Sequence, residues 1–524
     1  MKELKFEELS TRQKLGMTFV AAVHSDDRTE EDEDFAFVYE LIKNRSLGAV
    51  WIQQGYGNTQ RQIAKVREIA DYPILIFTDA ESGVGEYVVG KHNAIGSTGS
   101  EKHAYAFGKA VGVAARKMGY NVVCDPVVDM RDGSARSLGT DKYKVAAYAA
   151  AVARGMHDGG VLTVGKHYPG GINASGIDAH MAESYSVDTK QDLIDYSLYP
   201  YRKLNEEGLL DGIMVQHQRY ENIDPDHPAS LSKPVIDIIR ELGYEGFAIS
   251  DALCMMGIRA KFGDVASKGL AINAGIDLLL PYAYNNTEQF MQYCEAYEKG
   301  LVSDESLDMA VKRVLEAQHK TMLLPKDTEL TEEDIRTFKS INKDGVYTKT
   351  DAGVSHTISR DGKHFFIIVA TQETDIASGG RVDVDTFSNG WHFPSKITQK
   401  IKELFPNAGM QVIHQFPSQG EMCSVLDNSL GCDELVFMTF SEALAYTGKE
   451  HLTRRIVNLI EAMQVTDRIS TIIHCGNPHV LEELPHIPRY IFGGHSSESV
   501  DTCLEVLAGE YPANGVPTYE FELK

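Results

Sequence analysis

The segment over residues 161–180, VLTVGKHYPGGINASGIDAH, contains the residues whose types and spacing most clearly indicate catalysis. An apolar run ends at Lys166 and His167, turns through a Pro-Gly-Gly sequence and leads into Asp178-x-His180. A carboxylate two residues before a histidine can hydrogen-bond one ring nitrogen, fix the tautomer and raise the basicity of the other nitrogen. This pattern is typical of an acid/base catalyst. The alternative interpretation is a chance D-x-H in a loop Asx turn, with an exposed histidine.

Other polar residues lie where apolar runs end. Asp251 closes GFAISD and is a candidate nucleophile, with a helix N-cap as the alternative. For Lys166 and His167, the Pro-Gly turn that follows favours ligand contact over an ordinary buried ion pair. His217, considered alone, is more typical of a buried core histidine whose hydrogen bonds are satisfied. Arg136 could likewise form an ordinary salt bridge in a loop. The remaining polar strand ends are Asp79 and Asp125.

Seven apolar runs must position these residues. They lie between about residues 48 and 281 and read GAVWIQ, PILIFTD, YNVVCDP, VLTVGKH, GIMVQH, GFAISD and IDLLLP. Near-continuous apolar runs indicate parallel strands that are covered on both faces. Strand-helix units repeated in this way imply right-handed crossovers, and seven or so in succession favour a TIM-like (β/α)8 barrel over an open sheet. Active sites of such barrels lie at the C-terminal strand ends, where the candidate residues accumulate.

The helices between these runs carry their own start and stop signals. In one of them Ser232 can cap the first turn and Gly243 can end the last. Four apolar residues between them follow the spacing of one helix face, namely Val235, Ile238, Ile239 and Leu242. The strand GFAISD follows at once, as a barrel unit requires.

The pattern changes near residue 331. We predict an α/β protein with a barrel domain over residues 1–330 and a linker over 331–361 that holds a short helix and no strand. Over residues 362–524 a second alternation begins, with HFFIIVAT, MQVIHQF, ELVFMTF, STIIHCG and RYIFGG. This indicates a smaller, separate α/β sandwich domain.

Composition excludes several classes of function. The net charge of -24 argues against a nucleic acid or an anionic membrane as partner. The charged N-terminus and the lack of an apolar stretch of about 18 residues predict a cytoplasmic protein. The seven cysteines are scattered and most resemble reduced core thiols, and the dispersed histidines predict no metal and no cofactor.

The ordered motifs resemble glycoside hydrolase family 3, in its β-N-acetylglucosaminidase branch. KHYPGG followed by D-x-H resembles the family signature K-H-F-P-G-H-G...D-S/T-H. TDAESG, GYNVVCDPVVD, RSLGTD and the long run that ends in SDALCM match further family segments in the same order, and GEYPANGVPT is similar to the closing stretch. The resemblance spans nearly the whole chain, and the ordered set is more specific than any single motif.

The resemblance implies a retaining, exo-acting β-N-acetylhexosaminidase that acts on a small carbohydrate. Asp251 would be the nucleophile that forms a covalent glycosyl-enzyme. His180 would be the acid/base, oriented by Asp178, and its loop would close over the substrate. The innermost sugar would contact Asp79, Arg136, Lys166, His167 and, with a weaker match, His217. The barrel would supply all the catalytic groups and the second domain none.

Three departures from the family pattern bear on the substrate. The second histidine of P-G-H-G is replaced by Gly171-Ile172, the arginine downstream of Asp79 is missing, and Ala252 replaces a common acid. A β-glycosidase for another sugar, or a phosphorylase in which phosphate replaces water, is therefore an open alternative. A non-catalytic sugar-binding or scaffold protein is another, disfavoured because Asp178, His180 and Asp251 are all present.

Overall fold

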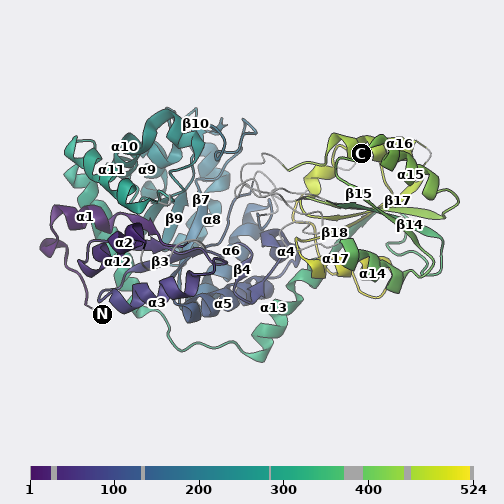
Figure 1. Cartoon of the computed structure of the whole chain (residues 1–524), viewed down its shortest axis with the longest axis horizontal. Helices are drawn as coiled ribbons and strands as arrows, with labels where there is room; N and C mark the ends of the chain where they lie inside the picture. The colour runs from purple at the N-terminus through teal and green to yellow at the C-terminus, as the bar shows by residue number, and fades with distance from the viewer. Residues whose placement is uncertain are drawn as a thin grey trace. The chain divides into compact units, whose positions relative to one another are not determined.

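The chain forms two compact units (Figure 1), which are described separately. The first comprises residues 1–88, 101–132 and 142–338, and the second comprises residues 89–100, 133–141 and 339–524. The computed structural model describes residues 2–24, 32–130, 136–282, 285–370, 394–441, 450–465 and 467–519.

A curved parallel sheet forms the centre of the first unit. Each strand pairs with its neighbour in parallel register. The order is β1 (Val20–Ala22), β2 (Ala49–Trp51), β3 (Leu75–Asp79), β6 (Val122–Cys124), β7 (Leu162–Tyr168), β9 (Gly212–Val215) and β12 (Phe247–Ser250).

The segment over residues 276–280 closes this sheet into a barrel. Leu279 bridges to Phe19 at one edge, and Leu278 bridges to Ile249 at the other. Val20 N–H donates to the carbonyl of Leu279 at 2.9 Å. Seven strands and this closing segment make eight, so the predicted (β/α)8 barrel is confirmed. The predicted runs include the closing segment and omit β1, which is only three residues long.

Helices cover the outside of the barrel. The helix predicted after Ser232 is α9 (Lys233–Glu241), in which the Ser232 side chain accepts from Val235 N–H and Gly243 follows with a φ of 84°. The other barrel-unit helices are α1 (Thr11–Met17), α2 (Glu33–Lys43), α3 (Thr59–Ile69), α5 (Glu101–Met118), α6 (Lys142–Gly159), α7 (Lys190–Asp192), α8 (Tyr199–Glu206), α10 (Met256–Ala274), α11 (Asn286–Glu298) and α12 (Asp304–Leu323).

Side chains fill the barrel interior. Alternate residues of the strands point inward, because successive side chains of a strand lie on opposite faces. These inward residues form one buried cluster that includes Trp51, Leu75, Phe77, Val164, Phe247, Ile249, Leu278 and Leu280. Val314 and Ala317 of α12 join the cluster, and Gln318 of the same helix donates to the carbonyl of Gly48, which precedes β2. Helix α12 therefore closes the N-terminal end of the barrel.

The second unit is a six-stranded sheet between two helix layers. The sheet has the order β13 (Tyr347–Thr350), β18 (Arg489–Gly493), β17 (Ile469–Cys475), β16 (Glu434–Phe440), β14 (His364–Ala370) and β15 (Gly409–His414), with only β13 antiparallel. Figure 1 shows α15 (Gln419–Asn428) and α16 (Arg454–Gln464) on one face, with α14 (Pro394–Leu404) and α17 (Ser497–Leu507) on the other. A separate apolar core lies under each layer, so the predicted α/β sandwich is confirmed.

The segment predicted as a linker, 331–361, holds more structure than expected. It contains α13 (Glu332–Asp344), which agrees with the short helix, and it also contains β13, which the sequence analysis does not predict. The strand YTKT has only one buried residue, Tyr347. The polar sequence of β13 gives no strand pattern, because an edge strand that is held by pairing with β18 needs few apolar residues. The exact division at residues 330 and 361 stays a prediction.

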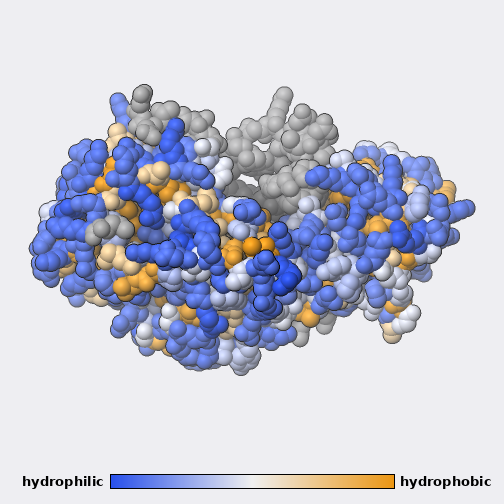
Figure 2. Space-filling model, turned by 90° about the horizontal axis from the view of Figure 1, so that it is seen from below, coloured by the Kyte–Doolittle hydropathy of each residue, from blue (hydrophilic) through white to orange (hydrophobic). Residues whose placement is uncertain are grey.

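The surface agrees with the acidic, polar composition. On the face in Figure 2 hydrophilic residues predominate, with smaller hydrophobic groups between them. Across the part of the chain that the structure describes, no helix is both long enough and apolar enough to cross a membrane.

Candidate active site

The inward alternation of the barrel strands places three predicted site residues in one layer. Leu75 and Phe77 point into the barrel, and Asp79 is the next residue on that face of β3. In the same way Lys166 follows Val164 in β7, and Asp251 follows Ile249 of β12. All three belong to the C-terminal strand ends, which we call the mouth of the barrel.

Asp251 is held by the backbone of the neighbouring strand β9 and by that of the next residue. Its N–H donates to the carbonyl of Val215 at 2.9 Å, and its Oδ1 accepts from Ala252 N–H at 2.7 Å. Helix α10 begins later, at Met256, with Met255 as its N-cap residue. The alternative of a helix N-cap is therefore wrong for Asp251. One carboxylate oxygen is fixed by Ala252, so Oδ2 is the atom that can attack.

Three histidines act on the charge of Asp251. Burial raises the pKa of this carboxyl group, but His167 lowers it, and so do His217, the Ala252 N–H and His180. The lowering effects prevail, so the pKa of Asp251 lies below its ordinary value. A carboxylate that stays ionised near neutral pH is suited to nucleophilic attack.

Asp178 and His180 form the expected pair. Asp178 Oδ1 accepts from His180 Nδ1 at 2.7 Å and from the backbone N–H of His180 at 2.9 Å. The two interpretations of this motif are therefore compatible: one carboxylate oxygen of Asp178 forms the Asx turn and also orients the ring of His180. Because Nδ1 donates to the carboxylate, the neutral ring has its basic lone pair on Nε2.

The loop that carries His180 is attached to the segment after Asp251. Met256 N–H donates to the carbonyl of His180 at 3.3 Å, and Gly257 N–H donates to that of Ala179 at 3.0 Å. A Cβ on Gly257 would lie within 3 Å of two carbonyl oxygens of this loop, so the close approach needs glycine here. The backbone thereby links the His180 loop to the segment that follows Asp251.

The first departure from the family pattern has a local cause. Gly171 has a φ of 102°, and a Cβ there would lie 2.6 Å from Oδ2 of Asp188. The same oxygen accepts from Ile172 N–H at 2.8 Å. A side chain at position 171 is excluded by this carboxylate as well as by the backbone conformation.

Lys166 is nearly inaccessible, with 2% of its side chain exposed, and it bridges two carboxylates. Its Nζ lies 2.6 Å from Oδ1 of Asp79 and 2.7 Å from Oε1 of Glu81. The simpler alternative, an ion pair with a neighbouring acid, is therefore present. Asp79 remains 36% exposed, so the same cluster can still accept hydrogen bonds from sugar hydroxyls.

A glutamine supports this cluster from the neighbouring strand. Gln54 Nε2 donates to the carbonyls of Asp79 and Gly83 at 3.1 and 2.7 Å. Its Oε1 accepts from Gly85 N–H at 3.2 Å. Gln54 thus fixes the segment in which the family has the arginine that this chain lacks.

His167 is oriented by a carboxylate in the same way as His180. Its Nδ1 donates to Oδ2 of Asp129 at 2.7 Å, and its backbone N–H donates to Oδ1 at 3.2 Å. Asp129 also fixes the tautomer of this ring, so that the basic lone pair of the neutral form is on Nε2.

His217 differs from the other two histidines because the protein occupies both of its nitrogens. Nε2 donates to the carbonyl of Ala252 at 2.9 Å, and Nδ1 accepts from the hydroxyl of Ser230 at 2.8 Å. Burial lowers its pKa, so the ring is neutral near pH 7 and adds positive charge near Asp251 only at lower pH. This arrangement suits a residue that positions the backbone beside the nucleophile, rather than one that binds a sugar hydroxyl.

The other sequence candidates fall elsewhere. Arg136 is half-buried in a turn and groups with the second unit, so its predicted sugar contact stays a prediction. Asp125 is fully buried, and its side chain accepts from Val127 N–H. Sequence reasoning missed Glu81, Asp129 and Gln54, although Glu81 lies in the recognised TDAESG segment and Asp129 ends GYNVVCDPVVD.

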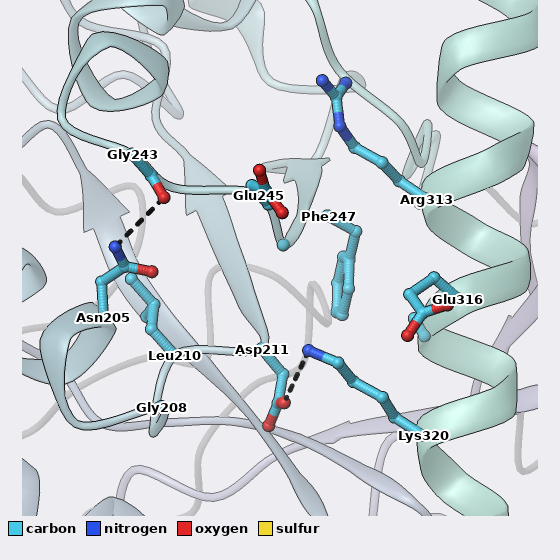
Figure 3. A pocket seen from close by; sticks show the side chains of 12 residues that line it. Asn205, Gly208, Leu210, Asp211, Gly243, Glu245, Phe247, Arg313, Glu316 and Lys320 are labelled. Carbon is cyan, nitrogen blue, oxygen red and sulfur yellow. Dashed lines mark hydrogen bonds and ion pairs between the residues drawn. The ribbon is translucent and has the colours of Figure 1, made fainter.

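A cavity of about 570 Å³ lies at the opposite end of the barrel, which we call the base. Figure 3 shows Asp211 before β9, Phe247 at the start of β12, and Lys320 of α12 along its wall. None of the predicted site residues lines it. Among the described residues, no group of three or more His, Cys, Asp or Glu side chains is arranged to hold a metal ion.

Comparison with known proteins agrees with this geometry. The sequence model described as Glycosyl hydrolase family 3 N terminal domain matches residues 14–317, which is more than half of the chain. The chain belongs to glycosyl hydrolase family 3. The predicted family and the prediction of a glycoside hydrolase are thereby confirmed.

Curated relatives within family 3 carry the name beta-hexosaminidase. Beta-hexosaminidase LpqI of Mycobacterium tuberculosis is 30% identical over 336 residues, which cover 58% of this chain and 82% of the relative. The beta-hexosaminidase of Haemophilus influenzae is 32% identical over 237 residues, which cover 42% and 67%.

Solved structures share the fold of nearly the whole chain. A glycoside hydrolase family 3 beta-N-acetylglucosaminidase from Paenibacillus sp. str. FPU-7 has a TM-score of 0.79 at 22% identity and covers 98% of this chain and 100% of its own. Beta-glucoside phosphorylase BglX has a TM-score of 0.78 at 20% identity and covers 98% and 94%. At these identities the likeness establishes the fold alone.

Proposed function

We propose that this protein is a retaining, exo-acting β-N-acetylhexosaminidase that removes terminal β-N-acetylglucosamine. The observation that carries the proposal is the pair of activated groups at one end of the barrel: an ionised Asp251 and a His180 oriented by Asp178. The names of the relatives support the choice of sugar.

In the first step Oδ2 of Asp251 attacks the anomeric carbon. The bond from that carbon to the leaving oxygen breaks, and its electron pair goes to the oxygen, which takes a proton from Nε2 of protonated His180. The products of this step are the free aglycone alcohol, neutral His180 and a glycosyl ester of Asp251. Asp178 stabilises the imidazolium before the transfer and keeps the ring in the tautomer that the next step uses.

In the second step His180 acts as a base. Its Nε2 takes a proton from water, the oxygen of that water attacks the anomeric carbon, and the ester bond to Asp251 breaks with its electron pair returning to Oδ2. Two displacements at one carbon give the sugar with its original β configuration. A histidine suits both roles, because the unperturbed pKa of about 6.5 allows either form near neutral pH.

The position of the polar residues around the barrel supports exo action. In the eight-stranded order, β3 with Asp79 and β12 with Asp251 are four steps apart, and therefore on opposite sides of the mouth. A sugar whose anomeric carbon meets Asp251 would direct its other end toward Asp79, Glu81 and Lys166. Groups that hold hydroxyls at that end favour a terminal residue.

The test is hydrolysis of p-nitrophenyl β-N-acetylglucosaminide and of the β-glucoside by the wild type, Asp251→Ala and His180→Ala. We expect turnover of the acetamido sugar that is lost in Asp251→Ala and reduced in His180→Ala. Proton NMR of the first product should show the β anomer. An α anomer would contradict the retaining mechanism, and preference for the glucoside would contradict the choice of sugar.

A matched control exists in the second unit. His486 donates to Asp351 at 2.8 Å, much as His180 donates to Asp178, but both side chains are largely exposed and lie outside the barrel. His486→Ala should leave both activities unchanged. Equal losses in His486→Ala and His180→Ala would mean that His180 has no special role.

Phosphorolysis is tested in the same assay by adding phosphate and measuring sugar 1-phosphate. A histidine acid/base repels phosphate less than a carboxylate would. However, the mouth holds Asp79, Glu81, Asp129, Asp178 and Asp251, which disfavour an anion. We therefore expect the free sugar with or without phosphate.

A further inference from the structure

Three neighbouring strand ends of the mouth carry aromatic rings instead of charges. In the barrel order β1, β2 and the closing segment 276–280 are adjacent, because Leu279 bridges beside β1 and β1 pairs with β2. His24 follows β1, Tyr56 follows β2 and Tyr282 follows the closing segment. The charged groups described above occupy the ends of the other strands.

Tyr282 belongs to the layer of the nucleophile. Leu278 and Leu280 point into the barrel, and Tyr282 is the next residue on that face, as Asp251 is in the neighbouring strand. Tyr282 packs on the interior cluster and meets Trp51 edge to face, with ring centroids 6.0 Å apart. Its ring therefore packs on the interior side chains at the mouth end of the barrel.

The three rings form one wall. The ring of His24 lies 4.7 Å from that of Tyr56 and 5.7 Å from that of Tyr282. His24 is buried, whereas Tyr56 and Tyr282 are half-exposed. Nδ1 of His24 lies 3.2 Å from the backbone nitrogen of Gln53 and 3.3 Å from the carbonyl oxygen of Trp51. Burial lowers the pKa of His24, and the wall stays uncharged near neutral pH.

The backbone of Tyr282 is strained. Its φ is 50°, in the left-handed region that bulky residues rarely adopt. Strain of this kind persists where the surrounding structure holds a residue in place, and it is concentrated at functional sites. The ring of this residue contacts the rings of Trp51 and His24.

We propose that Tyr282, His24 and Tyr56 form the apolar side of the innermost subsite and receive the methyl end of an acylamino group on the sugar. The inference rests on the proposed function and names how that site selects its sugar. Strand β7, with Lys166, lies four steps from β1, so Lys166 is across the mouth from the aromatic wall. The polar side suits hydroxyls. The wall suits a substituent with an apolar end, which a plain hydroxyl lacks.

The test is the ratio of kcat/KM for the p-nitrophenyl β-glycosides of N-acetylglucosamine and glucose. Tyr282→Ala should lower the preference for the acetamido sugar roughly ten-fold, since one methyl group in an apolar pocket accounts for a factor of that order. Tyr282→Phe keeps the ring and should keep the ratio. Tyr143→Ala, on α6 with 61% of the residue exposed, is the matched control and should change neither rate.

Two outcomes would overturn the inference. If Tyr282→Ala lowers kcat/KM equally for both glycosides while Tyr282→Phe has normal values, the ring only supports the barrel. A wild type that prefers the glucoside, or a ratio that Tyr282→Ala does not change, would show that the wall does not recognise an acylamino group.

Binding without turnover separates this inference from the proposed mechanism. In Asp251→Asn, N-acetylglucosamine and glucose can be titrated while fluorescence is followed, since Trp51 is one of two tryptophans and contacts Tyr282. Tighter binding of N-acetylglucosamine that is lost in Asp251→Asn/Tyr282→Ala supports the wall even if the catalytic roles are wrong. Equal binding of both sugars overturns the wall and leaves hydrolysis to be judged separately.

Discussion

The mouth and the base of the barrel both contain carboxylates that are paired with cations, but the number of cations for each carboxylate differs between the two ends. At the mouth one lysine serves both Asp79 and Glu81, and Asp251 has histidines around it instead of a salt bridge. At the base, Asp277 is bound by both Arg240 and Arg313 at 3.2 and 3.1 Å. Asp79 at the mouth therefore keeps 36% of its side chain exposed, whereas Asp277 at the base keeps 1%.

The base is built for packing and closure. Asp211 accepts from His157 Nε2 at 2.6 Å and from Thr163 N–H at 3.0 Å, and Lys320 lies 3.7 Å from its other oxygen (Figure 3). These contacts join α6, β7 and α12 to the start of β9. The cavity beside them is lined in part by Asp211, Arg313 and Lys320, which form ion pairs. In barrels of this kind the N-terminal end contributes stability rather than chemistry. A cavity alone is thus a poor guide to the active site here.

The largest predicted effect is at the mouth. Asp251→Asn should lower kcat by about 10⁴-fold or more, because the nucleophile is lost, as in other covalent mechanisms. The melting temperature should fall only slightly, because the lowered pKa of Asp251 means that its ionised carboxylate contributes to the stability of the folded state. Stopped assays and differential scanning calorimetry on the same preparation would check this. A variant that unfolds early would make Asp251 a structural residue and weaken the contrast with the base.

His180→Ala should have the next largest effect. General acid/base catalysis contributes about 10²- to 10⁴-fold, so kcat on a poor leaving group such as a methyl glycoside should fall by that order. The loss on the nitrophenyl glycoside should be smaller, because nitrophenolate leaves with little help from an acid. Equal losses on both substrates would argue against proton donation by His180.

Asp211→Asn should affect stability and not activity. Replacing the carboxylate removes the charge on its hydrogen bond from His157 and should lower the free energy of unfolding by about 1–2 kcal/mol, as for hydrogen bonds to charged groups. The values of kcat and KM of the folded protein should be unchanged. Urea unfolding beside kinetics would check this, and a drop in kcat without loss of stability would break the comparison.

The smallest effect concerns acid stability. Burial raises the pKa of Asp211. The hydrogen bond from His157, the charge of His157 and the Thr163 N–H together lower it by more, so the folded pKa lies below the ordinary value. Its contribution to stability is present above the unfolded pKa, about 3.9, and is lost as the pH falls through the folded pKa. Unfolding followed from pH 5 to pH 2 should therefore show a shallower loss of stability in Asp211→Asn than in the wild type. Parallel curves would contradict this.

Features that depend on neighbours in the chain could be predicted from the sequence. The apolar runs predicted the parallel strands of both units, and Ser232 and Gly243 predicted the ends of α9. The Asp178-x-His180 spacing predicted the hydrogen bond between these two side chains. Short elements without a strong pattern were missed, and β1 and β13 of the two main sheets are among them. A strand of three or four residues is held by its pairing partners, and its own sequence says little about them.

The sequence by itself thus determined the two α/β patterns, the family and the Asp178-His180 pair, because each depends on residues close together in the chain or on motif order. Only the tertiary structure brought Lys166 to Asp79 and Glu81, Asp129 to His167, and His217 to the carbonyl beside Asp251. It also placed Tyr282 and His24 in the ring of strand ends. The physical reason is closure of the barrel: strands far apart in sequence end in one layer only when their register is fixed, and no local pattern encodes that register.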